Sequence, residues 1–179
     1  MPRVPHLVAR LTLFTVALFA VALCMPPADA DVVKGGGQHQ DTRYGFTIAP
    51  PVFPVVQQGK MVQAVTFVAP ADGTFAANLN VMVQAMKVSP AQYLADTEGF
   101  AKKAGWKVNA VRKTKVSGQP ALYFDYEGKM GGMELHWFAL AVVRSKDVVL
   151  ATCTTLREKA RQYKAACEKS LQSLQVAPR

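Results

Sequence analysis

The sequence lacks the local motifs of the common catalytic classes. It has no serine in a G-x-S-x-G turn, no G-x-G-x-x-G stretch and no phosphate-binding loop. Histidine is also scarce, because only His39 and His136 lie beyond the first 30 residues. With so few groups suited to general acid–base chemistry, we expect a protein that is not an enzyme, and a hydrolase is the least favoured alternative.

Long apolar runs are also missing. The longest, Leu11 to Leu23, has 13 residues, whereas a membrane-spanning helix needs about 20. Basic residues precede this run, and Pro26, Pro27 and the small residues of Ala28-Asp29-Ala30 follow it. This layout predicts a signal peptide over residues 1–30, cleaved before Asp31. A permanent anchor and acylation of Cys24 are the alternatives, and the bulky Leu23 disfavours acylation.

Acidic residues are the scarcer charge. From Asp31 onward there are 19 Lys plus Arg against 11 Asp plus Glu, a net charge of +8. Such a charge favours anionic partners but says nothing about fold. Residues 31–41 are glycine-rich and polar and predict a flexible lead-in. Residues 42–176 then suit a single domain.

The pattern of this domain predicts an α+β fold. Ser89, Pro90 and Gln92 form the start of a helix, which Gly105 ends, and a second helix is expected over residues 156–174. Short turns separate the later strands, so we expect a mainly antiparallel sheet of about six to seven strands flanked by helices on both faces. The expected strands are Tyr44–Ile48, Met61–Val68, Phe75–Lys87, Trp106–Val116, Ala121–Glu127, Met133–Arg144 and Val148–Thr154.

Four short stretches resemble the family that contains the photosystem II extrinsic subunit PsbP and the bacterial periplasmic protein DcrB. They are Tyr44–Pro50 (YGFTIAP), Asn78–Val83 (NLNVMV), Gly118–Ala121 (GQPA) and Tyr163–Val176. Phe53 and Cys167 depart from the pattern, in which we expect a Trp and a large apolar residue. The resemblance implies a non-enzymatic α/β/α module, without a cofactor, that docks onto or assists larger assemblies.

The remaining cysteines, Cys153 and Cys167, allow several interpretations. An exported protein with two thiols ordinarily forms a disulfide. However, Thr155 and Glu158 have the spacing of a capping box, which predicts a helix from Leu156. Cys167 would then lie about 16 Å along that helix, beyond easy reach of Cys153. We therefore expect two separate buried thiols, with a disulfide second. Redox or metal use is disfavoured, because there is no C-x-x-C.

The hairpin over residues 121–144 contains a candidate ligand set. Placing Leu122, Phe124 and Tyr126 on one face with Leu135 and Trp137 fixes the register. Four polar residues then share the other face: Asp125, Glu127, Glu134 and His136. We expect a solvated polar face, and binding of a divalent metal or small ligand is the alternative.

Six basic residues and no acid lie between positions 102 and 115. They are Lys102, Lys103, Lys107, Arg112, Lys113 and Lys115. They either protect an exposed sheet edge from pairing or bind an anionic lipid, polymer or protein surface. Nucleic acid is disfavoured, because aromatic residues do not interleave with these lysines. The sequence thus predicts a periplasmic or secreted monomer that binds a protein or anionic envelope component.

Overall fold

The computed structural model describes residues 31–32, 37–52, 57–61 and 64–177. The predicted signal peptide, including Cys24, lies outside the described residues, as does Phe53. Within the described ranges, no helix combines the length and the apolar character needed to cross a membrane.

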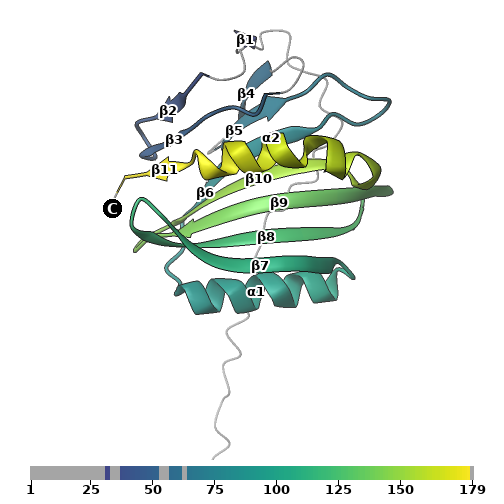
Figure 1. Ribbon diagram of the computed structural model, residues 1–179. Helices are drawn as coiled ribbons and strands as arrows, with labels where there is room; N and C mark the ends of the chain where they lie inside the picture. The colour runs from purple at the N-terminus through teal and green to yellow at the C-terminus, as the bar shows by residue number, and fades with distance from the viewer. Residues whose placement is uncertain (1–30, 33–36, 53–56, 62–63, 178–179) are drawn as a thin grey trace, which may run out of the picture.

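The main sheet is antiparallel and has eight strands in the order β1-β4-β5-β6-β10-β9-β8-β7 (Figure 1). The α+β prediction is confirmed, and the strand count exceeds the expected six to seven because β1 and β4 extend one edge. Met61 accordingly ends β4 instead of beginning the next strand. The bounds are β1 Asp31–Val32, β4 Gln57–Met61, β5 Ala64–Val68, β6 Asn78–Gln84, β7 Lys107–Val116, β8 Gln119–Met130, β9 Met133–Val143 and β10 Val148–Leu156.

A second, three-stranded sheet joins the two ends of the described chain. Its order is β11-β3-β2, formed by Gln175–Val176, Phe46–Ile48 and His39–Asp41. The sequence did not predict this sheet, and the expectation of a flexible lead-in is wrong for His39–Asp41, which pair with β3. The buried Arg144 guanidinium reinforces the junction: its Nη1 donates to the carbonyls of Tyr44 at 3.1 Å and Ala177 at 3.3 Å.

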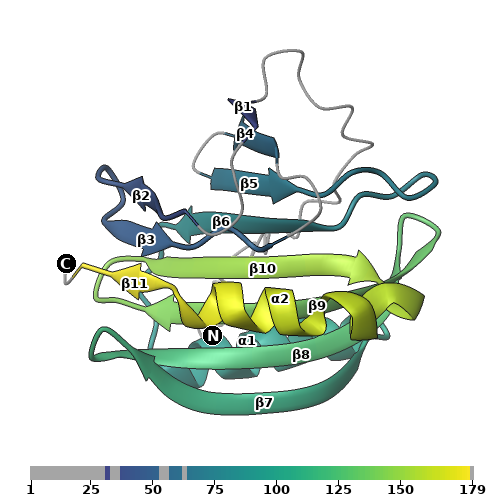
Figure 2. The ribbon, with the colours of Figure 1, turned by 45° about the horizontal axis from the view of Figure 1, so that its top comes forward.

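Two helices cover opposite faces of the main sheet, as predicted (Figures 1 and 2). Helix α1, Pro90–Lys103, packs on the face that carries Leu122 and Trp137. Helix α2, Ala160–Gln172, packs on the face that carries Phe138 and Leu140. Alternate side chains of each strand point to opposite faces of the sheet. Because a helix covers each face, both faces of the central strands are buried.

Helix α1 begins and ends as its sequence predicts. The backbone N–H of Gln92 donates to Ser89 Oγ at 3.1 Å, and Pro90 occupies the first turn, where its missing N–H costs no hydrogen bond. Gly105 follows the helix with φ +70°, a conformation that favours glycine. The N–H of Trp106 donates to the Ala101 carbonyl at 2.8 Å, which directs the chain back into β7.

Cys153 and Cys167 form a disulfide with their α-carbons 5.8 Å apart. The expectation of separate thiols is therefore wrong, and its premise of a helix from Leu156 fails. Strand β10 continues through Leu156, and a 3-10 turn, η1 (Arg157–Lys159), follows before α2. Thr155 is not a helix cap, because neither η1 nor α2 has a side-chain cap hydrogen bond; its hydroxyl donates to the Leu156 carbonyl.

Doubling back of the chain brings the cysteines together. Helix α2 returns along β10 after the turn (Figure 2). Cys167 lies seven residues after Ala160, about 10 Å along the helix axis. Cys153 lies three residues before the end of β10, also about 10 Å along the strand. The two distances from the turn match, so Cys153 on β10 and Cys167 on α2 lie opposite each other.

Candidate functional site

Strand β7 is one edge of the main sheet and carries four of the six predicted basic site residues. Among the described residues it pairs only with β8, and its register shifts at a bulge between Val108 and Ala110. In Figure 2 it is the outermost strand beyond β8. Four of the six predicted basic residues therefore lie on an edge strand of the described sheet.

The pairing of β7 with β8 divides its basic residues between the two faces. Lys107 lies opposite Glu127 and Arg112 lies opposite Tyr123, on the α2 face. Lys113 lies opposite Leu122, on the α1 face, and Lys115 shares that face because strand side chains alternate.

The two cations on the α2 face already have acidic partners. Lys107 Nζ lies 3.3 Å from Glu127 Oε1, and Arg112 Nη2 lies 3.9 Å from Glu168 Oε1 on α2. The Arg112 guanidinium also lies 4.2 Å from the centre of the Tyr123 ring. The Tyr123 hydroxyl donates to Glu168 Oε1 at 3.1 Å. Burial, followed by the Glu168 carboxylate, raises the pKa of Tyr123, so its hydroxyl stays a donor.

The other four basic residues are exposed, and no carboxylate of the described chain lies within 4.0 Å of their ammonium groups. Lys102 and Lys103 end α1, directly before β7, whereas Lys113 and Lys115 lie near its far end. Lys107 and Lys115 are eight residues apart, about 26 Å in a strand. The six residues therefore form a band and not a compact cluster; we call this band the basic edge.

The predicted hairpin register is confirmed, and it brings three of the four candidate metal ligands together. Glu127 pairs with His136, and Asp125 lies next to them on the same face. His136 Nε2 lies 2.8 Å from Asp125 Oδ1 without the alignment of a hydrogen bond, and His136 Nδ1 lies 3.6 Å from Glu127 Oε2. Asp125 and His136 are each only 8% exposed, so the expectation of a solvated face is wrong for them.

These residues do not form a metal site. Among the described residues, no group of three or more His, Cys, Asp or Glu side chains could hold a metal ion, and the predicted metal-binding alternative is wrong. Asn109 Nδ2 donates to Asp125 at 3.1 Å, and Lys164 of α2 lies 4.0 Å from its other oxygen. Glu134 points elsewhere and lies 3.4 Å from Arg157. The cluster instead joins three strands to α2.

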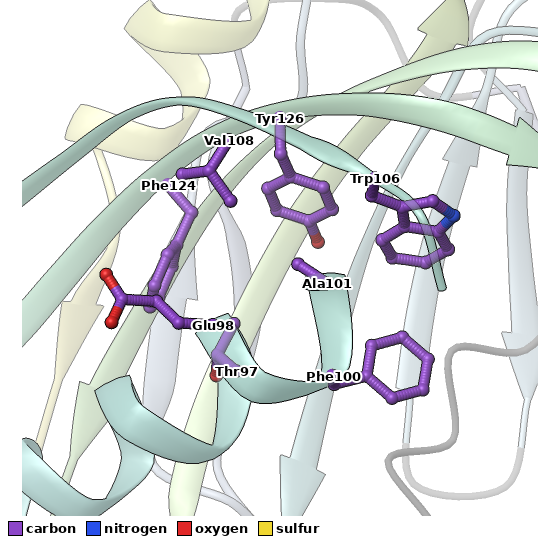
Figure 3. Close-up of a pocket in the computed structure, with 8 residues that line it drawn as sticks. All are labelled: Thr97, Glu98, Phe100, Ala101, Trp106, Val108, Phe124 and Tyr126. Carbon is purple, nitrogen blue, oxygen red and sulfur yellow. The ribbon is translucent and has the colours of Figure 1, made fainter. Parts of the chain in front are cut away.

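A small apolar pocket lies between α1 and the start of β7 (Figure 3). Its volume is about 20 Å³, room for roughly one water molecule. Aromatic rings fill the space beside it: Trp106 stacks on Tyr126 with ring centres 5.7 Å apart, and Phe100 meets Trp106 edge-on with ring centres 5.2 Å apart. Burial raises the pKa of Tyr126, which therefore stays neutral. The residues that line the pocket are Thr97, Glu98, Phe100, Ala101, Trp106, Val108, Phe124 and Tyr126.

Sequence reasoning missed this pocket. Trp106 lies in the turn before β7 and Tyr126 lies in β8. The turn after α1 and the pairing of β7 with β8 bring the two rings together. The alternation of apolar residues along β8 was the signal in the sequence that could have indicated this pocket. The pocket is a gap in the packing of α1 against the sheet, whereas the basic edge is accessible along its length.

No protein-family model and no curated protein matches the chain. Solved structures do match. LpqN, involved in cell envelope biogenesis of Mycobacterium tuberculosis, is 16% identical over 83% of this chain and 91% of its own, with a TM-score of 0.60. Protein PA94 of Pseudomonas aeruginosa, of unknown function, is 21% identical over 75% and 98%, with a TM-score of 0.56. CyanoP, the cyanobacterial PsbP of Synechocystis, is 14% identical over 81% and 94%, with a TM-score of 0.57. The chain therefore has the PsbP-like fold that its sequence resembles.

Proposed function

We propose that this protein is an exported, non-catalytic accessory domain that binds a protein or an anionic envelope component through the basic edge. The signal-like residues 1–30 support export. LpqN, a protein of cell envelope biogenesis, shares the fold, and neither LpqN nor CyanoP is described as an enzyme. These two observations support a periplasmic or secreted location.

The observation that carries the proposal is the set of exposed lysines without acidic partners in the described chain. Lys113 and Lys115 on β7, and Lys102 and Lys103 in the last turn of α1, keep their charges available to a partner. Unpaired surface charges of one sign accelerate encounter with an oppositely charged partner and orient it. The same residues have a structural role as well, because edge lysines oppose pairing between two copies of a strand. A monomer in the free state is therefore part of the proposal.

Charge reversal separates binding from edge protection. The variant Lys103→Glu, Lys113→Glu, Lys115→Glu should lose association with the envelope fraction in quantitative co-sedimentation. The matched control is Lys146→Glu, Arg161→Glu, Lys169→Glu. It makes the same change in net charge at exposed residues outside β7 and α1. Equal association of the two variants would remove the basic edge from the proposal. Aggregation of the first variant with unchanged binding would leave edge protection as the role of the lysines.

A further inference from the structure

We infer that the basic edge accepts its partner as an added β-strand: an extended acidic segment of a protein that pairs with residues Ala110–Val116 of β7. This inference rests on the proposed function and specifies the class of partner.

The backbone edge of β7 is available within the described structure. The sheet order ends at β7, which has β8 as its one strand neighbour. In a ladder of this kind, alternate residues direct their N–H and C=O groups away from the neighbour, so about half of those on β7 point outward. The bulge at Val108 and Ala110 leaves a regular stretch of seven residues, Ala110–Val116, and natural strands average about five to six.

The charges along this stretch specify the added strand. Lys113 and Lys115 project from the α1 face two residues apart, and no carboxylate of the described chain lies within ion-pair distance of them. Arg112 projects from the α2 face, where Glu168 already faces it. A complementary strand therefore carries acidic residues at every second position, with uncharged residues between them. Opposite charges directly across a strand pair stabilise it.

The same geometry disfavours other occupants. A second β7 would place lysines and arginine against like charges, which destabilises the pair. An anionic lipid surface would attract the lysines, but its headgroups cannot continue the backbone ladder of Ala110–Val116. An acidic peptide strand uses both the charges and the unpaired backbone groups.

The test uses two ten-residue probe peptides with blocked ends, each alternating glutamate with threonine. The first contains only L-residues; in the second every threonine has the D configuration, so charge and composition are unchanged but a regular strand is disfavoured. Backbone hydrogen bonds add to the affinity of the first peptide alone, and we expect it to bind the purified protein about tenfold more tightly. Amide exchange measured by NMR should slow at alternate residues of Ala110–Val116.

The outcomes distinguish this inference from the proposed function. Equal affinity of the two peptides without protection of β7 amides overturns strand addition and leaves electrostatic binding intact. Binding to vesicles of anionic lipid in place of either peptide, with the same lysine dependence, also overturns it. If the first peptide binds, Lys113→Gln with Lys115→Gln should weaken it, whereas Lys146→Gln with Lys169→Gln should not. Loss of envelope association in the charge-reversal variant reports on the proposed function independently.

Discussion

Both faces of the main sheet are packed with apolar side chains, but each face adds a different interaction to that packing. On the α1 face, three aromatic rings stack, with ring centres 4.4 Å apart for Trp106 and Trp137 and 5.3 Å apart for Tyr126 and Trp137. On the α2 face, the helix is tied to the sheet by the Cys153–Cys167 disulfide. Helix α1 has a side-chain cap and α2 has none. The helix without a side-chain cap thus has a covalent attachment, whereas the capped helix is held by packing.

The largest expected effect tests the aromatic packing of the α1 face. Trp137 is 1% exposed, and Trp137→Ala should lower the free energy of unfolding by about 3–5 kcal/mol, because it removes buried apolar surface and leaves a cavity. Urea denaturation measures the change, and Trp137→Phe should lose much less. A cost of the alanine variant below that of the phenylalanine variant would show that the rings do not hold this face.

The next effect tests the covalent attachment of the α2 face. Replacing both cysteines by alanine should lower the free energy of unfolding by about 3 kcal/mol, since the disulfide closes a loop of about 15 residues. Amides of α2 should then exchange faster while those of α1 remain protected. Equal loss of protection in both helices would contradict the separation of the two faces.

Gly128→Ala should disturb the α1 face from within the sheet. A Cβ at this position would lie 2.2 Å from Trp106 Cδ1, and overpacking of this kind typically costs about 1–3 kcal/mol. Gly99→Ala is the matched control, because a Cβ there meets nothing within 4 Å inside α1. The control should gain up to about 1 kcal/mol from helix propensity. Thermal denaturation would refute the account if the two variants changed the melting temperature in the same direction.

Removal of the α1 cap should have a smaller effect. Ser89→Ala deletes the acceptor for the Gln92 N–H and should cost about 1 kcal/mol. Ser89→Asp keeps an acceptor and should retain nearly full stability in the same denaturant series. A larger loss for the aspartate than for the alanine would mean that Ser89 acts through something other than capping.

The smallest effect concerns pH and the core of the α2 face. Burial lowers the pKa of His39, with partial opposition from Asp41, and its ring centre lies 5.6 Å from that of Phe67. The unfolded chain therefore binds a proton first as the pH falls below about 6.5, and stability decreases. His39→Gln should remove this part of the decrease between pH 7 and 5. An unchanged pH profile of unfolding would contradict the assignment.

Sequence reasoning succeeded where local chemistry decides the structure. Ser89, Pro90 and Gly105 mark the ends of α1 through their own backbone preferences. The hairpin register followed from matching Phe124 and Tyr126 to apolar residues across the strand pair. Neither inference needed information from distant parts of the chain.

Sequence reasoning failed where the structure depends on contacts between distant parts of the chain. The disulfide depends on η1, which delays the start of α2 and returns Cys167 over Cys153. The second sheet pairs β3 with β11, about 130 residues later. In the site, the basic residues were identified by composition, but their division between two faces, with Glu168 opposite Arg112, required the register and the helix together.

Both faces of the sheet are closed, and the proposed site requires that the β7 edge is open. Amide hydrogen exchange of the free protein, followed by NMR, tests this directly. We predict that alternate amides of Ala110–Val116 exchange rapidly while their neighbours that pair with β8, and the amides of β8 itself, are protected. Uniform protection along β7, equal to that of β8, would mean that the edge is already covered and would contradict the proposed site.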